Sequence, residues 1–154
     1  MKKNINFYKI KNILIIYIIF IIDYYTKSFL ISTLKINEKR KIFKFLNIRN
    51  TKNYGLIFGL FKKQMLYNNF FLYSINILFL ISIFSIIYFC FKKKNSNNLS
   101  FTLLISGALG NFFDRLKYGY VIDFFDFHCY KYHFPIFNIA DISIFFSLIL
   151  FIIK

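Results

Sequence analysis

The sequence predicts an all-α integral membrane protein with four transmembrane helices, a small extracytoplasmic β element and an interfacial loop or helix. The 154-residue chain is 58% hydrophobic and 23% aromatic, with a mean hydropathy of +0.53. These values exceed what the core of a small soluble domain needs. Its apolar residues gather in four runs suited to crossing a bilayer. They predict one membrane domain, 1–154, with spans at about 13–34, 67–91, 99–116 and 135–153 and loops at 35–66 and 117–134.

The charge distribution gives the expected partners and orientation. The chain has 21 Lys and Arg residues against six Asp and Glu, a net charge of +15. The basic residues flank apolar runs instead of interleaving with aromatic residues on a polar face, so we expect membrane lipids and no nucleic acid as partners. They are denser in the two termini and in the Lys92–Ser100 linker than in the loops. Both termini are therefore expected to be cytoplasmic.

The first apolar run follows several lysines, as in a signal peptide, but it is too long and has no small-residue cleavage site. Asp23 and Lys27 lie on one face of it, four residues apart, with the acid first, which is the favourable order for an ion pair. They either neutralise each other so that the helix can insert, or belong to a functional site.

The loop at 35–66 shows weak alternation of apolar and polar residues, with glycines as breaks, and predicts a small strand-like element lying on the membrane. Asn53 and Gly55 lie within it and can equally form a simple turn. The second apolar run, 67–91, shows no residues that suggest chemistry. Cys90 at its end and Cys129 are expected on opposite sides of the membrane, so no disulfide is predicted.

The third run combines small and polar residues. Asn111, Asp114 and Arg115 lie within one helical turn and can all face the interior of a helix bundle. We expect Asp114 and Arg115 to form a structural ion pair. Close contact between helices is favoured by the small residues Gly107, Ala108 and Gly110.

The loop at 117–134 is rich in Tyr and Phe, which favour the membrane interface. We expect Asp126 to be a loop carboxylate that solvent satisfies. Asp126, His128, Cys129 and His133 lie close together in sequence, but their spacing fits no familiar zinc pattern, so no metal is predicted.

Asp123 and Asp141 lie where an apolar helix is expected to meet the membrane surface. An ionisable residue at membrane depth costs on the order of 2 to 3 kcal/mol and by default marks a functional site. Two carboxylates that approach each other have separated pKa values, so one holds a proton while the other stays ionised. Pro135 near the start of the fourth run predicts a helix beginning there. Asn138 and Asp141 would then share a face, with Asp141 about two turns, roughly 9 Å, from its start.

Five blocks occur along most of the chain: DYYTK from Asp23, KNYGLIF from Lys52, GN-x-x-DR from Gly110, GYVIDFFDF from Gly119 and FNIAD from Phe137. In this order they resemble the conserved blocks of the lipoprotein signal peptidases, the type II signal peptidase family. The resemblance implies an aspartic endopeptidase of the bacterial cytoplasmic (inner) membrane, with its active site near the extracytoplasmic face. It would remove signal peptides from diacylglyceryl-modified prolipoproteins, cutting on the N-terminal side of the lipidated cysteine.

The resemblance also implies residue roles. Asp123 and Asp141 would be the catalytic pair, and Asn111 and Arg115 would position the site and contact substrate. The remaining matched residues would support the site or bind substrate: Asp23, Lys27, Asn53, Gly55, Gly107 and Asn138. No metal or organic cofactor is implied, and we expect a monomer.

Two alternatives remain open from the sequence. A small transporter or channel subunit could use Asp23, Asp123 and Asp141 as a proton or cation relay, although neither inverted repeats nor a broken helix in each half is visible. A purely structural four-helix protein does not explain why carboxylates persist in so acid-poor a chain. Other intramembrane peptidases are disfavoured because their motifs, H-E-x-x-H, G-x-S-x-G and G-x-G-D, are absent.

Overall fold

A computed structural model describes residues 2–55 and 99–153, with side chains from residue 8 onward. Six isolated positions between these ranges are helical: Ser74, Ile77, Leu78, Ile81, Ser85 and Tyr88. Most of the predicted second span, the end of the first loop and Cys90 lie outside the described residues.

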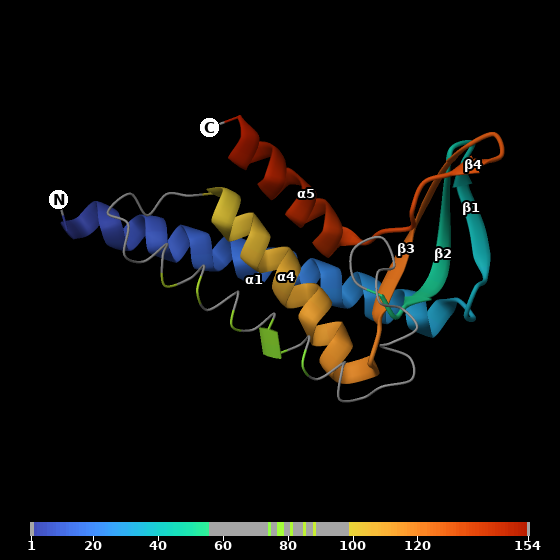
Figure 1. The fold of residues 1–154 in the computed structure, drawn as a ribbon, viewed down its shortest axis with the longest axis horizontal. Helices are drawn as coiled ribbons and strands as arrows, with labels where there is room; N and C mark the ends of the chain where they lie inside the picture. The colour runs from blue at the N-terminus through green and yellow to red at the C-terminus, as the bar shows by residue number, and fades with distance from the viewer. Residues whose placement is uncertain are drawn as a thin grey trace.

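In the described part of the chain, three helices lie side by side, and a four-stranded antiparallel sheet extends beyond one end of them (Figure 1). The helices are α1 (Lys2–Thr33), α4 (Leu99–Tyr118) and α5 (Ile139–Ile152). The start of α1 and the end of α5 both lie away from the sheet (Figure 1). Within the described part of the chain, α1 is the one helix long and apolar enough to cross a membrane, over Tyr8–Thr33, and α5 is a shorter apolar helix.

Polar side chains fill the interior and apolar side chains cover the outside. Among the described residues, 14 polar or charged residues are buried against nine hydrophobic ones. Large apolar residues on α1 and α5 are exposed instead, among them Ile13, Tyr17 and Phe145, each about 60% accessible. An apolar surface of this extent needs a lipid or protein environment. This inverted distribution agrees with the membrane protein that the composition predicts.

The helices contact each other closely through small residues and hydroxyl groups. A Cβ atom added to Gly107 would collide with the backbone carbonyl of Ala140 on α5. Ser143 and Ser147 of α5 donate to the backbone carbonyls of Leu103 (2.8 Å) and Ser100 (2.7 Å) on α4. Close backbone approach and hydrogen bonds between helices are what hold helices together where lipid removes the hydrophobic driving force.

The sheet has the order β1-β2-β3-β4, from β1 (Lys39–Phe43), β2 (Leu46–Asn53), β3 (Val121–Cys129) and β4 (Tyr132–His133). The prediction of a loop or helix at 117–134 was therefore wrong, because this segment supplies two of the four strands. Its β-branched and aromatic residues favour extended structure. Gly119 and Tyr130, both with positive φ, mark the turns at either end of β3.

A small apolar cluster joins the sheet to the helices. Leu30 and Leu34 at the end of α1 pack against Phe124 of β3, and Ile48, Phe125 and Ile139 surround them. Because β3 is held against both α1 and the start of α5, Asp123 has a fixed position relative to the helices.

Candidate active site

Asp141 lies in the first turn of α5, where it forms a capping box with Asn138. The Asn138 side chain accepts the Asp141 backbone N–H at 2.9 Å, and the Asp141 carboxylate accepts the Asn138 backbone N–H at 3.2 Å. The helix therefore begins at Ile139, so the prediction that it starts near Pro135 and carries Asp141 two turns further on was wrong. Phe137, the residue before the cap Asn138, forms an isolated antiparallel bridge with Phe125 of β3 instead of joining the helix.

Asp123 lies on β3 and is buried, with 3% of the residue exposed. Its Oδ2 accepts from the Asn53 side chain at 2.9 Å, and its Oδ1 accepts from the Asn138 side chain at 2.7 Å. Asn53 belongs to β2, which pairs with β3 so that Thr51 lies opposite Asp123. The Thr51 hydroxyl donates to the Asp123 backbone carbonyl at 2.7 Å. Both backbone and side chain of Asp123 are thus fixed by β2.

Asn138 connects the two aspartates, since it caps the helix turn that carries Asp141 and donates to Asp123. Burial and the negative charge of Asp141 raise the pKa of the Asp123 carboxyl to about 7, against the hydrogen bonds from Asn53 and Asn138, which lower it. Asp123 can therefore hold a proton at neutral pH beside a second carboxylate. This is the arrangement needed for paired acid and base chemistry.

Asn111 of α4 supports Asp141 from the other side. Its amide nitrogen donates to Asp141 Oδ1 at 2.7 Å, and its amide oxygen accepts from Lys27 Nζ at 3.2 Å and from Asn138 at 3.1 Å. Donors on one side and an acceptor on the other define the orientation of the amide. Asn111 therefore couples a buried ammonium group to Asp141.

Lys27 forms ion pairs with two buried carboxylates. Its Nζ lies 2.6 Å from Asp23, the pair that the sequence spacing predicts, and 2.9 Å from Asp114. Asp23 also accepts the Ala140 backbone N–H (3.0 Å) at the start of α5, and Asp114 accepts the Ile122 backbone N–H (3.1 Å) of β3. This group therefore joins α1, α4, α5 and β3.

The predicted Asp114–Arg115 ion pair was wrong. In the part of the chain that the structure describes, the ion-pair partner of Asp114 is Lys27, and Arg115 donates to two backbone carbonyls, those of Asn111 (3.3 Å) and Gly55 (3.2 Å). Adjacent residues on a helix point in different directions, which separates the two side chains. Arg115 instead ties the end of β2 to α4.

Asn53 and Gly55 form a turn that also belongs to the site. The Asn53 side-chain oxygen accepts the Gly55 backbone N–H at 2.9 Å while its nitrogen donates to Asp123. Gly110 lies opposite Asp23, where an added Cβ would be 2.7 Å from Asp23 Oδ2. The structure thus brings Asp23, Lys27, Asn53, Gly55, Asn111, Arg115 and Asn138 into one network with Asp123 and Asp141, and places Gly107 at the adjoining helix contact.

Asp126 lies outside this network, further along β3, and the expectation that solvent satisfies it was wrong. It is 1% exposed and accepts from Asn47 at 3.1 Å and from the His133 ring at 2.5 Å. Burial raises the pKa of Asp126, but the hydrogen bonds from His133 and Asn47 outweigh it and hold that pKa below its usual value. Asn47 and Thr51 were missed because their roles depend on the pairing of β2 with β3, which a single strand does not reveal.

Comparison with known proteins identifies the family of this chain. The signal peptidase (SPase) II family model matches residues 15–154. This chain belongs to the signal peptidase II family. A lipoprotein signal peptidase of Wigglesworthia glossinidia brevipalpis is 42% identical over 149 residues, covering 94% of this chain and 93% of the relative. One from Buchnera aphidicola subsp. Schizaphis graminum is 41% identical over 141 residues, covering 91% and 90%.

Two solved structures share this fold. One of a bacterial membrane enzyme has a TM-score of 0.77 and 38% identity, and the match covers 93% of this chain and 85% of that chain. A second, also of a bacterial membrane enzyme, has a TM-score of 0.76 and 37% identity, with 93% and 90% covered. Membership of a peptidase family decides against the transporter alternative, and the chain is an aspartic peptidase.

Proposed function

We propose that this chain removes signal peptides from prolipoproteins whose conserved cysteine carries diacylglycerol, cutting on the N-terminal side of that cysteine. Its relatives in Buchnera and Wigglesworthia are lipoprotein signal peptidases, which supports the substrate class. The observation that carries the mechanism is the side chain of Asn138, which binds Asp123 while capping the turn that holds Asp141.

The two aspartates have different surroundings, which supports different roles. Asp141 accepts hydrogen bonds from Asn111 and from the Asn138 backbone, lies at a helix N-terminus, and is linked through Asn111 to the Lys27 cation. These features stabilise negative charge. Asp123 is buried beside that charge, and its pKa of about 7 favours the protonated form. We therefore assign Asp141 as the base and Asp123 as the acid.

The reaction then follows with every proton accounted for. Asp141 takes a proton from a water molecule, whose oxygen attacks the scissile carbonyl carbon while the Asp123 proton passes to the carbonyl oxygen. As the tetrahedral intermediate collapses, the C–N bond breaks, Asp141 gives its proton to the departing amine, and Asp123 recovers its own. Two carboxylates and one water supply the chemistry, so we propose neither a metal nor an organic cofactor. Arg115 and the Asn53–Gly55 turn, which lie beside Asp123, are assigned to positioning and substrate contact.

The proposed setting is the bacterial cytoplasmic membrane. We assign four spans with both termini cytoplasmic, so that the sheet and the aspartates lie near the extracytoplasmic face, and a monomer surrounded by lipid. The long apolar helix α1 and the chain ends of α1 and α5 lying away from the sheet support this arrangement (Figure 1). The acyl chains of the substrate would bring the scissile bond to this depth, since each buried CH₂ contributes about 0.8 kcal/mol to membrane binding.

Complementation tests the proposal. The chain is expressed in a bacterium that lacks its own type II signal peptidase, and conversion of diacylglyceryl-prolipoprotein to the mature form is followed on a gel. We expect the wild-type chain to restore processing and to leave unlipidated precursor almost uncut. Equal cleavage of lipidated and unlipidated precursor would contradict the assigned substrate.

A further inference from the structure

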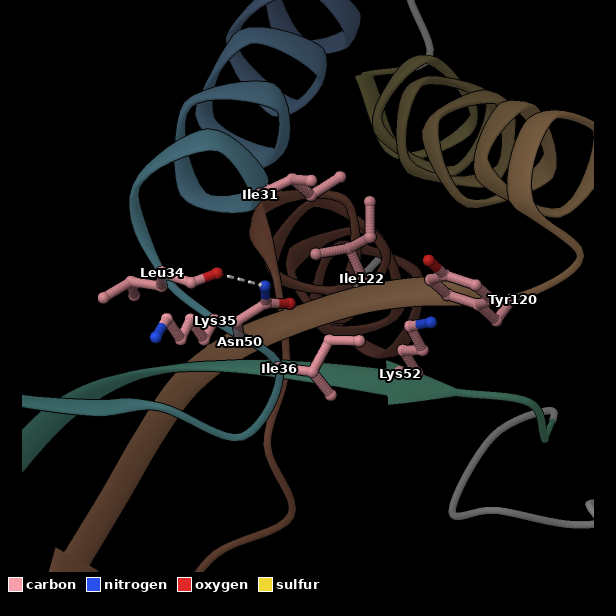
Figure 2. Close-up of a pocket in the computed structure, with 8 residues that line it drawn as sticks. All are labelled: Ile31, Leu34, Lys35, Ile36, Asn50, Lys52, Tyr120 and Ile122. Atoms are coloured by element: carbon pink, nitrogen blue, oxygen red, sulfur yellow. Dashed lines mark hydrogen bonds between the residues drawn. The ribbon is translucent and has the colours of Figure 1, made fainter.

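A pocket of about 440 Å³ lies where the end of α1 meets β2 and β3 (Figure 2). One wall is apolar and consists of Ile31, Leu34 and Ile36 at the end of α1 and just beyond it, with Ile122 of β3. Ile31 and Ile36 remain 39% and 56% exposed. The pocket therefore offers uncovered apolar surface at the end of the long apolar helix.

The rest of the lining is cationic and polar. Lys52 and Tyr120 lie together on one side of the pocket, and Lys35 lies at the opposite edge with its ammonium group directed away from them (Figure 2). The Lys52 ammonium group is 4.7 Å from the centroid of the Tyr120 ring. Among the described residues no acidic side chain pairs with either lysine, since Glu38 pairs with Arg40 and accepts only the backbone N–H of Lys35. Two lysines without acidic partners, one on either edge of an apolar wall, suit an amphipathic anion.

The pocket is separate from the aspartate pair. Lys52 pairs with Ile122 and Thr51 pairs with Asp123 across β2 and β3. Because successive residues of a strand point to opposite faces, Lys52 and Ile122 lie on the reverse face of the sheet from Asp123. A molecule in this pocket would contact the strand that carries Asp123 without obstructing its carboxylate.

We infer that this pocket binds the phosphate headgroup of an anionic phospholipid, with the first carbons of an acyl chain against Ile31 and Ile36. The lysines supply the charge that attracts anionic headgroups at a membrane surface. The apolar wall selects a lipid over a free anion, which would leave Ile31 and Ile36 uncovered. The inference goes beyond the proposed peptidase activity and depends on α1 crossing the membrane, not on the chemistry of Asp123.

Lipid retention by the purified full-length protein tests the inference. The protein, in a neutral detergent, is mixed with dioleoyl phosphatidylglycerol or dioleoyl phosphatidylcholine, and native mass spectrometry counts the lipids retained. We expect phosphatidylglycerol to be retained at least about fivefold more than phosphatidylcholine, because only it places a net negative charge beside the lysines. The variant Lys35→Gln/Lys52→Gln should lose this preference, and Lys35→Arg/Lys52→Arg should keep it.

A matched control removes the same charge elsewhere. Lys41→Gln/Lys44→Gln deletes two exposed lysines of the β1–β2 hairpin outside the pocket and should keep the preference. Equal loss in both double variants, or equal retention of the two lipids by the wild type, overturns the inference. Displacement of the lipid by inorganic phosphate at equal concentration overturns the choice of a lipid. If the pocket double variant fails to fold, the single variants Lys35→Gln and Lys52→Gln give the same comparison.

Discussion

Asn111 donates a 2.7 Å hydrogen bond from its side-chain amide to the carboxylate of Asp141. The oxygen of the same amide accepts from Lys27, which is itself held between Asp23 and Asp114. One cation thus contacts two buried carboxylates and, through a neutral amide, supports a third. Its removal should therefore affect much more than one ion pair.

Replacing Lys27 by Met should leave Asp23 and Asp114 buried without a counter-charge. Breaking a buried ion pair by removing one partner costs about 3–5 kcal/mol. We expect a large loss of folded protein, measured as monodisperse material after purification and as the unfolding midpoint in detergent. The control Lys44→Met changes an exposed lysine and should shift the free energy of unfolding by less than about 0.5 kcal/mol.

A second variant separates charge balance from packing. Lys27→Met/Asp114→Asn removes one of the two carboxylates that pair with Lys27, and Asp23 keeps its hydrogen bond from Ala140. Part of the folded protein should return. If Lys27→Met is as stable as Lys44→Met, the buried charges do not hold the helices together.

The sequence predicted contacts between residues that lie close together along the chain. It did not predict contacts that depend on how distant segments pair. The spacing of Asp23 and Lys27 predicted their ion pair. The positions of Asn111 and Asp114 within one helical turn predicted that both face the interior of the helix bundle. The partner of Asp114, however, is Lys27, 87 positions earlier, and no local pattern links them. The segment from Val121 to Cys129 shows no clean alternation of apolar and polar residues, because both faces of β3 are buried at its start. The strand was therefore not predicted.

The start of α5 was misread for a different reason. Asn138 and Asp141 have the N-x-x-D spacing of a helix cap, which was available in the sequence. Pro135 suggested an earlier start. The residues after it are instead held extended by backbone hydrogen bonds between Phe137 and Phe125 of β3, a contact that only the folded chain creates.

The pKa of about 7 for Asp123 predicts a pH dependence of activity. Asp123 acts as the acid and must carry a proton, so kcat/KM for a lipidated substrate should fall as pH rises through and above about 7. The affinity for an uncleavable lipidated peptide should not fall over the same pH range. A profile that is flat from pH 6 to 9 would remove Asp123 from the role of acid.

The same shift predicts a pH dependence of stability. The pKa of Asp123 is raised from 3.8 in the unfolded chain to about 7 in the folded one. The folded state then binds more protons between these values, so the contribution of Asp123 to stability is fully present below about pH 4 and is lost as pH rises to 7. Asp123→Asn cannot ionise and should raise the unfolding midpoint relative to the wild type at pH 8 but not at pH 4. An equal shift at both values would show that ionisation is not the cause.

Cysteine labelling tests the proposed orientation. Cys129 is a free, exposed thiol at the last position of β3. It therefore belongs to the sheet, which we assign to the extracytoplasmic face. A membrane-impermeant maleimide should label it in intact cells once the outer membrane is made permeable, whereas Cys90, predicted at the cytoplasmic end of the second span, should stay unlabelled. Labelling of Cys129 that requires disruption of the cytoplasmic membrane would reverse the orientation.

The final prediction separates the carboxylates of β3 and α5. Asp123→Asn and Asp141→Asn keep the size of the side chain but cannot exchange a proton, so each should reduce cleavage to background while the protein still folds. The double variant should be no worse than either single one, because residues that act as a unit fail together.

Asp126→Asn is the matched control on the same strand as Asp123. It weakens the charge-assisted bonds from Asn47 and His133 and should lower stability by about 1–3 kcal/mol, with cleavage per folded molecule retained. The assay follows lipidated precursor, normalised to enzyme on a blot. If Asp126→Asn is inactive while Asp123→Asn or Asp141→Asn still cleaves, the catalytic pair is wrongly assigned.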